Sequence, residues 1–250
     1  MSLALSQIDL VVLCGGRGTR LGLLTQATPK PLLPVAGKPF LWFLLRSLRK
    51  EGFRRILLSI HYLPDQFREF IERYQQEIPE MEWVVEPEPL GTGGALQWAS
   101  KRVRSSLFAA INGDSWFDQP FGPVLASHQQ GGRSFTAVGV DPFRVEGGAS
   151  GKGIWTLDSV GGLADLRSRE TASQDWVNAG RYLLETDRVR AWPAGRYALE
   201  EKVGSLFKGW KTGLFCSSAR LLDIGTPELY AQAGRLLKEG REGEVCLGVG

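Results

Sequence analysis

Short, mainly apolar runs alternate with longer amphipathic stretches along the first half of the chain. Runs of five or six apolar residues predict buried strands, whereas apolar side chains three or four positions apart predict helices. Phe67, Phe70, Ile71 and Tyr74 have this helical spacing. Strands that alternate with helices indicate parallel βαβ units and an α/β fold. The predicted strands are 8–13, 56–60, 83–85 and 107–111, and the predicted helices begin at Pro39, Pro64 and near Thr92.

The second half of the chain has a less regular pattern. Its predicted elements are strands at 135–140, 176–184 and 221–224, a glycine-rich loop at 147–153, a short helix at 198–206 and a helix from about Thr226. Neither an internal repeat nor a polar linker divides the chain, so we predict a single domain. The predicted parts are residues 1–240 as this domain, with a nucleotide-binding half at 8–135, a sugar-binding and C-terminal lobe at 136–240, and a tail at 241–250.

The amino-acid composition argues against several classes of protein. With 43% hydrophobic and 23% charged residues, the chain has the composition of a folded globular protein. Its 3 Cys lack Cys-x-x-Cys spacing and it has 2 His, so a disulfide framework, a structural zinc site and a histidine-based catalytic triad are disfavoured. The net charge of +3 is too small to indicate a nucleic-acid partner. The longest apolar runs fall well short of the ~20 residues that span a membrane, and the first residues do not resemble a secretory signal, so we expect a cytoplasmic protein without a membrane partner.

A glycine-rich turn, Gly15-Gly16-Arg17-Gly18-Thr19-Arg20, directly follows the first predicted strand. Such a turn is often only structural, but its glycines also allow successive backbone N–H groups to surround a phosphate. A Walker A loop is excluded because no Lys-Ser or Lys-Thr follows, and a dinucleotide-binding turn is excluded because Leu21 stands where its third glycine would be. Lys30 lies ten residues after Arg20 in a stiff Pro-Lys-Pro segment. The two cations are therefore predicted to face a phosphate chain.

Two long strings, Leu13–Leu21 and Pro29–Pro39, resemble the sugar-1-phosphate nucleotidylyltransferases. Further similar motifs follow in the family's order, so the resemblance covers about residues 8–235. These motifs are Glu88–Ala95, Asn112–Asp114, Asn178–Tyr182, Leu199–Glu201 and Asp223–Glu228. Their wording is most similar to short members that use GTP and D-glycero-α-D-manno-heptose 1-phosphate. The alternative is a uridylyltransferase of N-acetylmuramic acid 1-phosphate or another hexose-1-phosphate nucleotidylyltransferase.

The resemblance implies a Rossmann-like nucleotidyltransferase fold, with a mixed, mostly parallel sheet flanked by helices, and bound Mg²⁺. It implies catalytic roles for Arg20 and Lys30 and metal ligation by Asp114 and Asp223. The implied nucleotide-binding residues are Leu13, Gly15, Gly16, Gly18, Thr19, Glu88, Gly91, Thr92 and Gly93. The implied sugar-phosphate-binding residues are Asn112, Gly153, Arg169, Asn178, Gly180 and Glu200. The expected partners are a nucleoside triphosphate, with GTP favoured, and a sugar 1-phosphate, and a homo-oligomer remains open.

Some of these assignments have alternatives in the sequence itself. Glu88 is either an acceptor for guanine or a solvated loop charge, and Asp223 could simply arrange the start of the following helix. Many relatives carry a Glu-Lys pair where this chain reads Leu166-Arg167-Ser168-Arg169-Glu170, so Arg169, or else Arg167, would replace the lysine.

Two other classes of protein were weighed against the enzyme. A glycosyltransferase usually carries Asp-x-Asp, but Ser115-Trp116 follows Asp114. An inactive nucleotide-sugar sensor tends to lose the metal carboxylates or the lysine, and all three are present here. The sequence therefore favours an enzyme.

Overall fold

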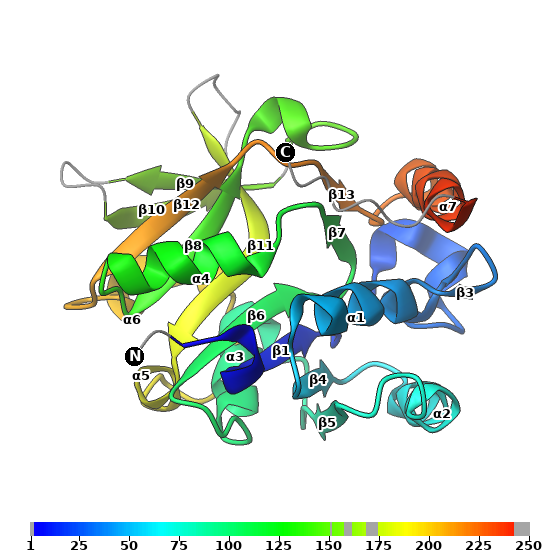
Figure 1. The fold of residues 1–250 in the computed structure, drawn as a ribbon, viewed down its shortest axis with the longest axis horizontal. Coiled ribbons are helices and arrows are strands. Elements are labelled where there is room, and N and C mark those ends of the chain that lie inside the picture. Colours follow the sequence, from blue (N-terminus) through cyan, green and yellow to red (C-terminus); the bar gives the residue numbers. More distant parts are fainter. Residues whose placement is uncertain (1–2, 151, 158–161, 169–174, 243–250) are drawn as a thin grey trace.

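The computed structural model describes residues 3–150, 152–157, 162–168 and 175–242. Its centre is a nine-stranded sheet with the path β10-β9-β11-β6-β1-β4-β5, and β8 joins β11 to β12 (Figure 1). The strands of this sheet are β1 (Asp9–Leu13), β4 (Ile56–Ile60), β5 (Met81–Val85), β6 (Leu107–Asn112), β8 (Phe135–Val140), β9 (Gly153–Leu157), β10 (Leu163–Ser168), β11 (Trp176–Glu185) and β12 (Thr212–Ser217).

Strand direction agrees with the predicted fold class. β10 and β11 run opposite to the other seven strands, because β11 is antiparallel to β6, β8 and β9, and β10 is antiparallel to β9. The pairs β1–β4, β1–β6, β4–β5 and β8–β12 are parallel. The sheet is therefore mixed and mostly parallel, and the prediction of an α/β fold is confirmed.

Helices cover both faces of the sheet. Alternation along β1 directs Val12 into one apolar cluster, with Leu44 of α1 and Phe67 of α2, and Val11 into a second cluster on the other face. The α-helices are α1 (Phe40–Glu51), α2 (Pro64–Tyr74), α3 (Gly91–Ser100), α4 (Phe121–Gln130), α5 (Thr186–Arg190), α6 (Val203–Leu206) and α7 (Pro227–Glu242). Short 3-10 helices occupy Leu5–Gln7, Thr19–Thr25, Lys30–Leu32, Pro142–Arg144 and Leu199–Glu201.

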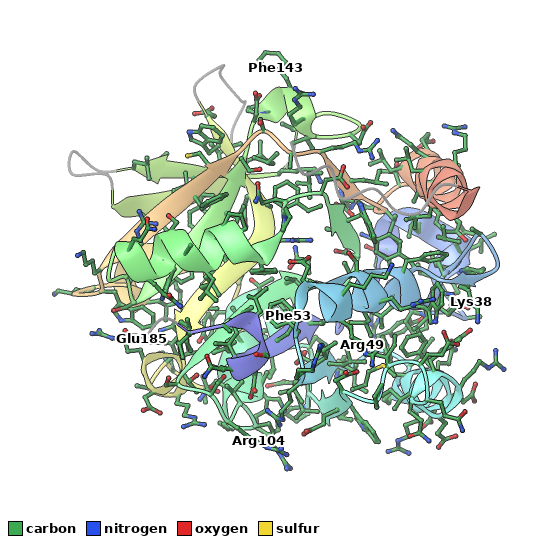
Figure 2. All side chains as sticks on the ribbon, viewed as in Figure 1. Lys38, Arg49, Phe53, Arg104, Phe143 and Glu185 are labelled. Carbon is green, nitrogen blue, oxygen red and sulfur yellow. The ribbon has the colours of Figure 1, made fainter. Side chains whose placement is uncertain are left out.

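Aromatic packing joins helices that are far apart in the sequence. Phe53, labelled in Figure 2, is fully buried after α1, and its ring lies 5.4 Å from the ring of Phe121 in α4. Phe143, labelled at the top of the view, is 82% exposed. The aromatic core therefore includes the contact between Phe53 and α4, whereas Phe143 of the 3-10 helix Pro142–Arg144 lies outside it.

Most predicted elements occur within one or two residues of their predicted bounds. The strand predicted at 83–85 begins two residues earlier, and the predicted helix at 198–206 is a 3-10 turn followed by the short α6. The described part of the chain also contains eight strands and α-helices that were not predicted: β2, β3, β7, β9, β10, β12, α4 and α5.

Two small sheets complete the fold and one of them bears on function. β2 (Pro34–Val35) pairs with β3 (Lys38–Pro39), and β7 (Ser115–Phe117) pairs antiparallel with β13 (Leu221–Asp223). In the second pair Asp223 lies opposite Ser115, and the amide of Ile224 donates to the carbonyl of Asp114 at 3.1 Å. This pairing brings two carboxylates together across more than a hundred residues.

Within the described residues, none of the helices combines the length and apolar character needed to cross a bilayer.

Candidate active site

The glycine-rich turn lies at the carboxyl end of β1, where ligands bind in open α/β sheets. The Cys14 amide still donates to Ser59 of β4 at 2.8 Å, and the chain then leaves the sheet. Gly18 has a φ of 63°, a left-handed conformation that favours glycine. The turn borders a cavity of about 270 Å³ lined by Leu13, Cys14, Gly16, Gly18, Thr19, Arg20, Lys30, Pro31, Asp114 and Gly225. Most of the predicted phosphate-facing residues thus line one cavity.

Lys30 is the centre of the charged cluster in this cavity. Its Nζ lies 2.6 Å from Oδ2 of Asp114 and 2.8 Å from Oδ1 of Asp223, and its side chain is 6% exposed. Burial acts to lower the pKa of Lys30, but the charges and hydrogen bonds of the two carboxylates outweigh it, so the net pKa is raised. A permanent ammonium therefore bridges the two predicted metal ligands.

Asp223 is surrounded by cations. Besides Lys30, Nζ of Lys152 lies 3.1 Å from its Oδ2, and a guanidinium nitrogen of Arg20 lies 3.7 Å from the same oxygen. Burial acts to raise the pKa of Asp223, but the lysines prevail and the pKa is lowered. Asp223 is therefore ionised, and it belongs to the charged cluster instead of only arranging the start of the following helix.

Gly225 makes this convergence possible. A Cβ at this position would lie 2.9 Å from the Arg20 guanidinium, 3.0 Å from the Asp223 carboxylate and 3.2 Å from Lys30 Nζ. Sequence reasoning did not select Gly225, although it stands inside the Asp-Ile-Gly-Thr-Pro string. A glycine two residues after a predicted metal ligand was the available signal.

Beside the glycine-rich turn lies a second residue that sequence reasoning missed. Glu86 is buried after β5, and its Oε1 would lie 2.8 Å from a Cβ on Gly15. Oε1 accepts from the Ser59 hydroxyl at 2.8 Å, and Oε2 accepts from the Leu90 amide at 3.3 Å. Burial raises the pKa of Glu86, against the opposing effect of these hydrogen bonds. Glu88, which was predicted to accept hydrogen bonds from guanine, is exposed.

The start of α3 packs against the segment before α6. The amides of Gly93 and Gly94 both donate to the Tyr197 carbonyl, at 3.2 and 3.3 Å. The hydroxyl of Thr92 donates to Glu200 at 3.0 Å. Gly91, with a φ of 70°, would place a Cβ 2.6 Å from the Tyr197 carbonyl oxygen. In this structure the predicted nucleobase loop therefore contacts the predicted sugar-side residue Glu200 directly.

The other predicted sugar-side residues gather on β11 and β6. The amide of Gly180 donates to Asn178 Oδ1 at 3.0 Å, and Asn178 Nδ2 donates to the Tyr182 hydroxyl at 2.7 Å. Gly180 has a φ of 63° and leaves room for Asn112, whose Nδ2 would lie 2.3 Å from a Cβ there. Burial, and then the charge of Glu200, raise the pKa of the Tyr182 phenol.

Two predicted residues of this side remain, Gly153 and Arg169, together with Arg181, which the motif includes but which was not itself predicted to bind. Gly153 is the first residue of β9, next to the charged cluster through Lys152. Arg169 lies outside the described residues, and so does the side chain of Arg167. Arg181, within the Asn178–Tyr182 motif, points into the core and donates to the carbonyls of Phe117 and Gln119, at 3.0 and 2.6 Å. It therefore holds the chain just after β7, and burial lowers its pKa to about 10.

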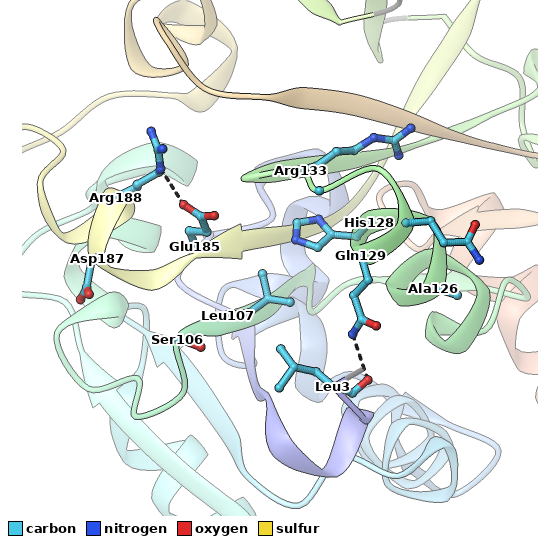
Figure 3. Close-up of a pocket in the computed structure, with 12 residues that line it drawn as sticks. Leu3, Ser106, Leu107, Ala126, His128, Gln129, Arg133, Glu185, Asp187 and Arg188 are labelled. Carbon is cyan, nitrogen blue, oxygen red and sulfur yellow. Dashed lines mark hydrogen bonds and ion pairs between the residues drawn. The ribbon is translucent and has the colours of Figure 1, made fainter. Parts of the chain in front are cut away.

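A larger cavity of about 830 Å³ lies elsewhere, between α4, α5 and the amino-terminal segment (Figure 3). None of the predicted site residues lines it. It is bordered by Leu3, Ser106, Leu107, Ala126, His128, Gln129, Gln130, Gly132, Arg133, Glu185, Asp187 and Arg188. Its charges are mostly paired, since Arg188 contacts Glu185 and Asp187 contacts Arg190. The smaller cavity, with its converging cations and carboxylates, is the better candidate for catalysis.

Comparison with known proteins agrees with this geometry. Residues 10–193 match the family model described as Nucleotidyl transferase. The chain belongs to the nucleotidyl transferase family. It is therefore an enzyme of the nucleotidyltransferase class, and the matched range includes the glycine-rich turn, Lys30 and Asp114.

The individual relatives of this nucleotidyltransferase differ in sequence identity and in how much of each protein the match covers. It is 32% identical to a mannose-1-phosphate guanylyltransferase of Mycobacterium tuberculosis, over 95% of this chain and 67% of the relative. It is 27% identical to a D-glycero-alpha-D-manno-heptose 1-phosphate guanylyltransferase of Campylobacter jejuni, over 88% of this chain and 96% of the relative. Among solved structures, HddC from Yersinia pseudotuberculosis, crystallised with GMP-PN, superposes with a TM-score of 0.79 at 28% identity, over 92% of this chain and 99% of that one.

Proposed function

We propose that this nucleotidyltransferase transfers a guanylyl group from GTP to a sugar 1-phosphate, giving a GDP-sugar and pyrophosphate. The observation that carries the proposal is the position of Lys30 between Asp114 and Asp223, beside a glycine-rich turn that lines the same cavity. The names of both relatives support the guanylyltransferase assignment.

The reaction needs positioning and charge neutralisation more than proton transfer. An oxygen of the sugar phosphate forms a bond to the α-phosphorus of GTP as the bond to the bridging oxygen breaks and pyrophosphate leaves. A phosphate monoester has its second pKa near ~6, so this oxygen is already ionised at neutral pH and requires no general base. Arg20 and Lys30 lower the repulsion between the two anions, and in phosphoryl transfer such electrostatic stabilisation supplies most of the catalysis.

Asp114 and Asp223 fit a magnesium ion. Mg²⁺ prefers one or two carboxylates completed by substrate phosphates and water. The two carboxylates face the same position, and in this structure the Lys30 ammonium lies there and donates to both. The described residues contain no group of three or more His, Cys, Asp or Glu side chains able to hold a metal, as expected if phosphates complete the coordination. When bound, the ion would neutralise phosphate charge, and Lys30 would then be free to contact a phosphate oxygen.

Glu86 supports guanine as the base. The N1–H and N2–H₂ groups of guanine are adjacent donors, so one carboxylate can accept from both. Uracil presents a single N–H between two carbonyl oxygens, which an anionic carboxylate would repel. Ser59 and the Leu90 amide fix the Glu86 carboxylate next to Gly15, whereas Glu88 is exposed two residues further on. We therefore assign the reading of guanine to Glu86 in preference to Glu88.

The heptose phosphate is our proposed acceptor. The support for it is that the motifs of this chain, such as Asp223–Glu228, are most similar to those of heptose-specific members, and that a heptose enzyme of Campylobacter jejuni matches 88% of this chain. The mannose enzyme has the higher identity, which makes mannose 1-phosphate the second candidate.

Pyrophosphate release measured with Mg²⁺ would test the whole proposal. GTP, UTP, ATP, CTP and dTTP are each paired with heptose, mannose, glucose and N-acetylmuramic acid 1-phosphates. Turnover with GTP and the heptose phosphate is the expected result. Faster turnover with mannose 1-phosphate would overturn the sugar assignment alone, and a preference for UTP would overturn the guanylyl assignment.

Two matched variants test the base assignment. Glu86→Gln should reduce the preference for GTP over UTP by about 5- to 150-fold, because a good bidentate contact contributes ~1–3 kcal/mol of discrimination. Glu88→Gln should leave the preference unchanged. The reverse pattern would restore Glu88 to the role predicted from sequence.

A further inference from the structure

Lys152 is a cation of the candidate active site that the sequence motifs did not identify. It directly precedes β9, and its Nζ lies 3.1 Å from Oδ2 of Asp223. Its side chain is 18% exposed, so the ammonium is held inside the site. Among the residues that the structure describes, Asp223 is its only ion-pair partner.

The two lysines that contact Asp223 come from segments far apart in the sequence. Lys30 follows the glycine-rich turn and contacts Oδ1, whereas Lys152 contacts Oδ2. Ile154 of β9 pairs with Val177 of β11, so the start of β9 lies beside the segment that carries Asn178. Lys152 therefore lies between the paired carboxylates and the predicted sugar side.

Charge balance gives this lysine a role. In the protein alone, Asp114 and Asp223 offset two of the three cations Lys30, Lys152 and Arg20. Substrate binding adds a triphosphate and a phosphate monoester of roughly −1.5 to −2. Lys30 and Arg20 belong to the segment that carries the glycine-rich turn, so among the three cations of this cluster Lys152 is the one that lies beside the strand carrying Asn178. Its flexible four-carbon stem allows the ammonium to move from Asp223 to a nearby phosphate oxygen.

We propose that Lys152 binds the phosphate of the sugar 1-phosphate, and that Asp223 holds its ammonium in place until this substrate arrives. This inference rests on the proposed function, because it requires a phosphorylated sugar as the acceptor. It gives the two lysines separate tasks: Lys30 contacts the carboxylates and the nucleotide, and Lys152 binds the phosphate of the acceptor.

The test compares Lys152→Met, which keeps the length and removes the charge, with Lys152→Arg, which keeps the charge. Initial rates are measured at saturating GTP with the acceptor that wild type uses best in the substrate panel, and then at saturating acceptor with varied GTP. Lys152→Met should raise the KM for the sugar 1-phosphate at least tenfold and change the KM for GTP less than twofold. Lys152→Arg should recover most of the loss. Lys208→Met, which removes an exposed charge elsewhere, should behave as wild type.

A binding measurement separates this role from a purely structural one. The same sugar 1-phosphate, and the sugar without its phosphate, are titrated calorimetrically into protein that holds Mg²⁺ and a non-hydrolysable GTP analogue. Lys152→Met should weaken binding of the phosphorylated sugar alone. An unchanged KM for the sugar phosphate, or equal rises in both KM values, would overturn the proposal while wild-type turnover still supports the function. A wild-type enzyme inactive across the panel would overturn both.

Discussion

The sheet divides into two regions that are built in different ways. The parallel region, β1, β4, β5 and β6, consists of neighbouring strands joined by helices close in the sequence. The mixed region, β8 to β12, joins strands that are far apart in the sequence, since β8 pairs with both β11 and β12. The parallel region ends in the glycine-rich turn, Glu86 and Asp114, whereas the mixed region carries Lys152 and Asn178.

The difference shows where the active site can form. Lys30 and Asp114 belong to the part of the chain that builds the parallel region, but Asp223 follows β12 and reaches them through the β7–β13 pair. Neither region alone holds both carboxylates. The charged cluster therefore exists only where the two regions meet, and variants at this boundary should have the largest effects.

Replacing Lys30 should have the largest effect on turnover. Lys30→Met removes the ammonium that contacts both carboxylates, and loss of one such electrostatic group typically costs about 10²–10³ in kcat. We expect turnover to fall at least about a hundredfold, measured as pyrophosphate release. The protein without substrates should also bind Mg²⁺ more tightly, because the ammonium no longer competes for the carboxylates.

Lys38→Met is the matched control for this change. Lys38 is a partly exposed lysine eight residues further on, and its nearest ion-pair contact is Glu77 at 3.8 Å. Its removal should leave turnover within twofold of wild type. A folded Lys30→Met enzyme with the wild-type rate would show that Lys30 takes no part in catalysis. It would also show that variants at the boundary of the two regions do not have the largest effects on turnover.

The sequence predicted the parallel region well because its signals are local. Continuous apolar runs such as Ile56–Ile60 form strands buried on both faces, and the adjacent helices follow within a short loop. In the mixed region, β12 reads Thr-Gly-Leu-Phe-Cys-Ser and has no clear period. Its place is fixed by pairing with β8, more than seventy residues earlier, so local patterns could not identify it.

The same contrast applies to the site. Motif spacing was sufficient to select Arg20, Lys30 and Asp114, which the structure brings to one cavity. It selected Glu88 and missed Glu86, although the two flank the same proline in a charged loop. The choice depends on a hydrogen bond from the Glu86 amide to Ile60 at 2.8 Å, which continues the β4–β5 ladder and keeps Glu86 inside. Lys152 was missed because nothing near it in the sequence indicates Asp223.

A close contact between the two regions should govern stability. A Cβ on Gly94 of α3 would lie 2.2 Å from the Gly195 carbonyl oxygen, which belongs to the segment after α5. Gly94→Ala should therefore lower the free energy of unfolding by about 3 kcal/mol, the upper end of the usual cost of overpacking. For a chain of this size that is a fall of roughly 6–12 °C in Tm, measured by calorimetry.

Gly122→Ala is the control for this substitution. Gly122 lies in α4, and a Cβ there would have nothing within 4 Å. Alanine at this position should be neutral or should stabilise the helix by up to about 1 kcal/mol. Equal losses in the two variants would show that the boundary between the regions is no more tightly packed than an open helix surface.

The two histidines, one beside each region, provide the last and smallest test. His128 of α4 packs onto β8, where its Nδ1 lies 2.9 Å from the Thr136 hydroxyl, and it borders the larger cavity (Figure 3). Burial, and then the charge of Arg133, lower its pKa from 6.5 to about 4, with Glu185 opposing. His128 therefore binds a proton near pH 6.5 in the unfolded chain, but only near pH 4 in the folded protein. The free energy of unfolding should decline as the pH falls through this window, by about 2 kcal/mol between pH 6.5 and 5.

His128→Gln should remove this part of the decline in urea titrations at pH 8 and pH 5. His61→Gln, at the end of β4 in the parallel region, should keep it, because it leaves His128 in place. A His128→Gln protein that loses as much stability at pH 5 as wild type would show that the mixed region does not hold this imidazole neutral.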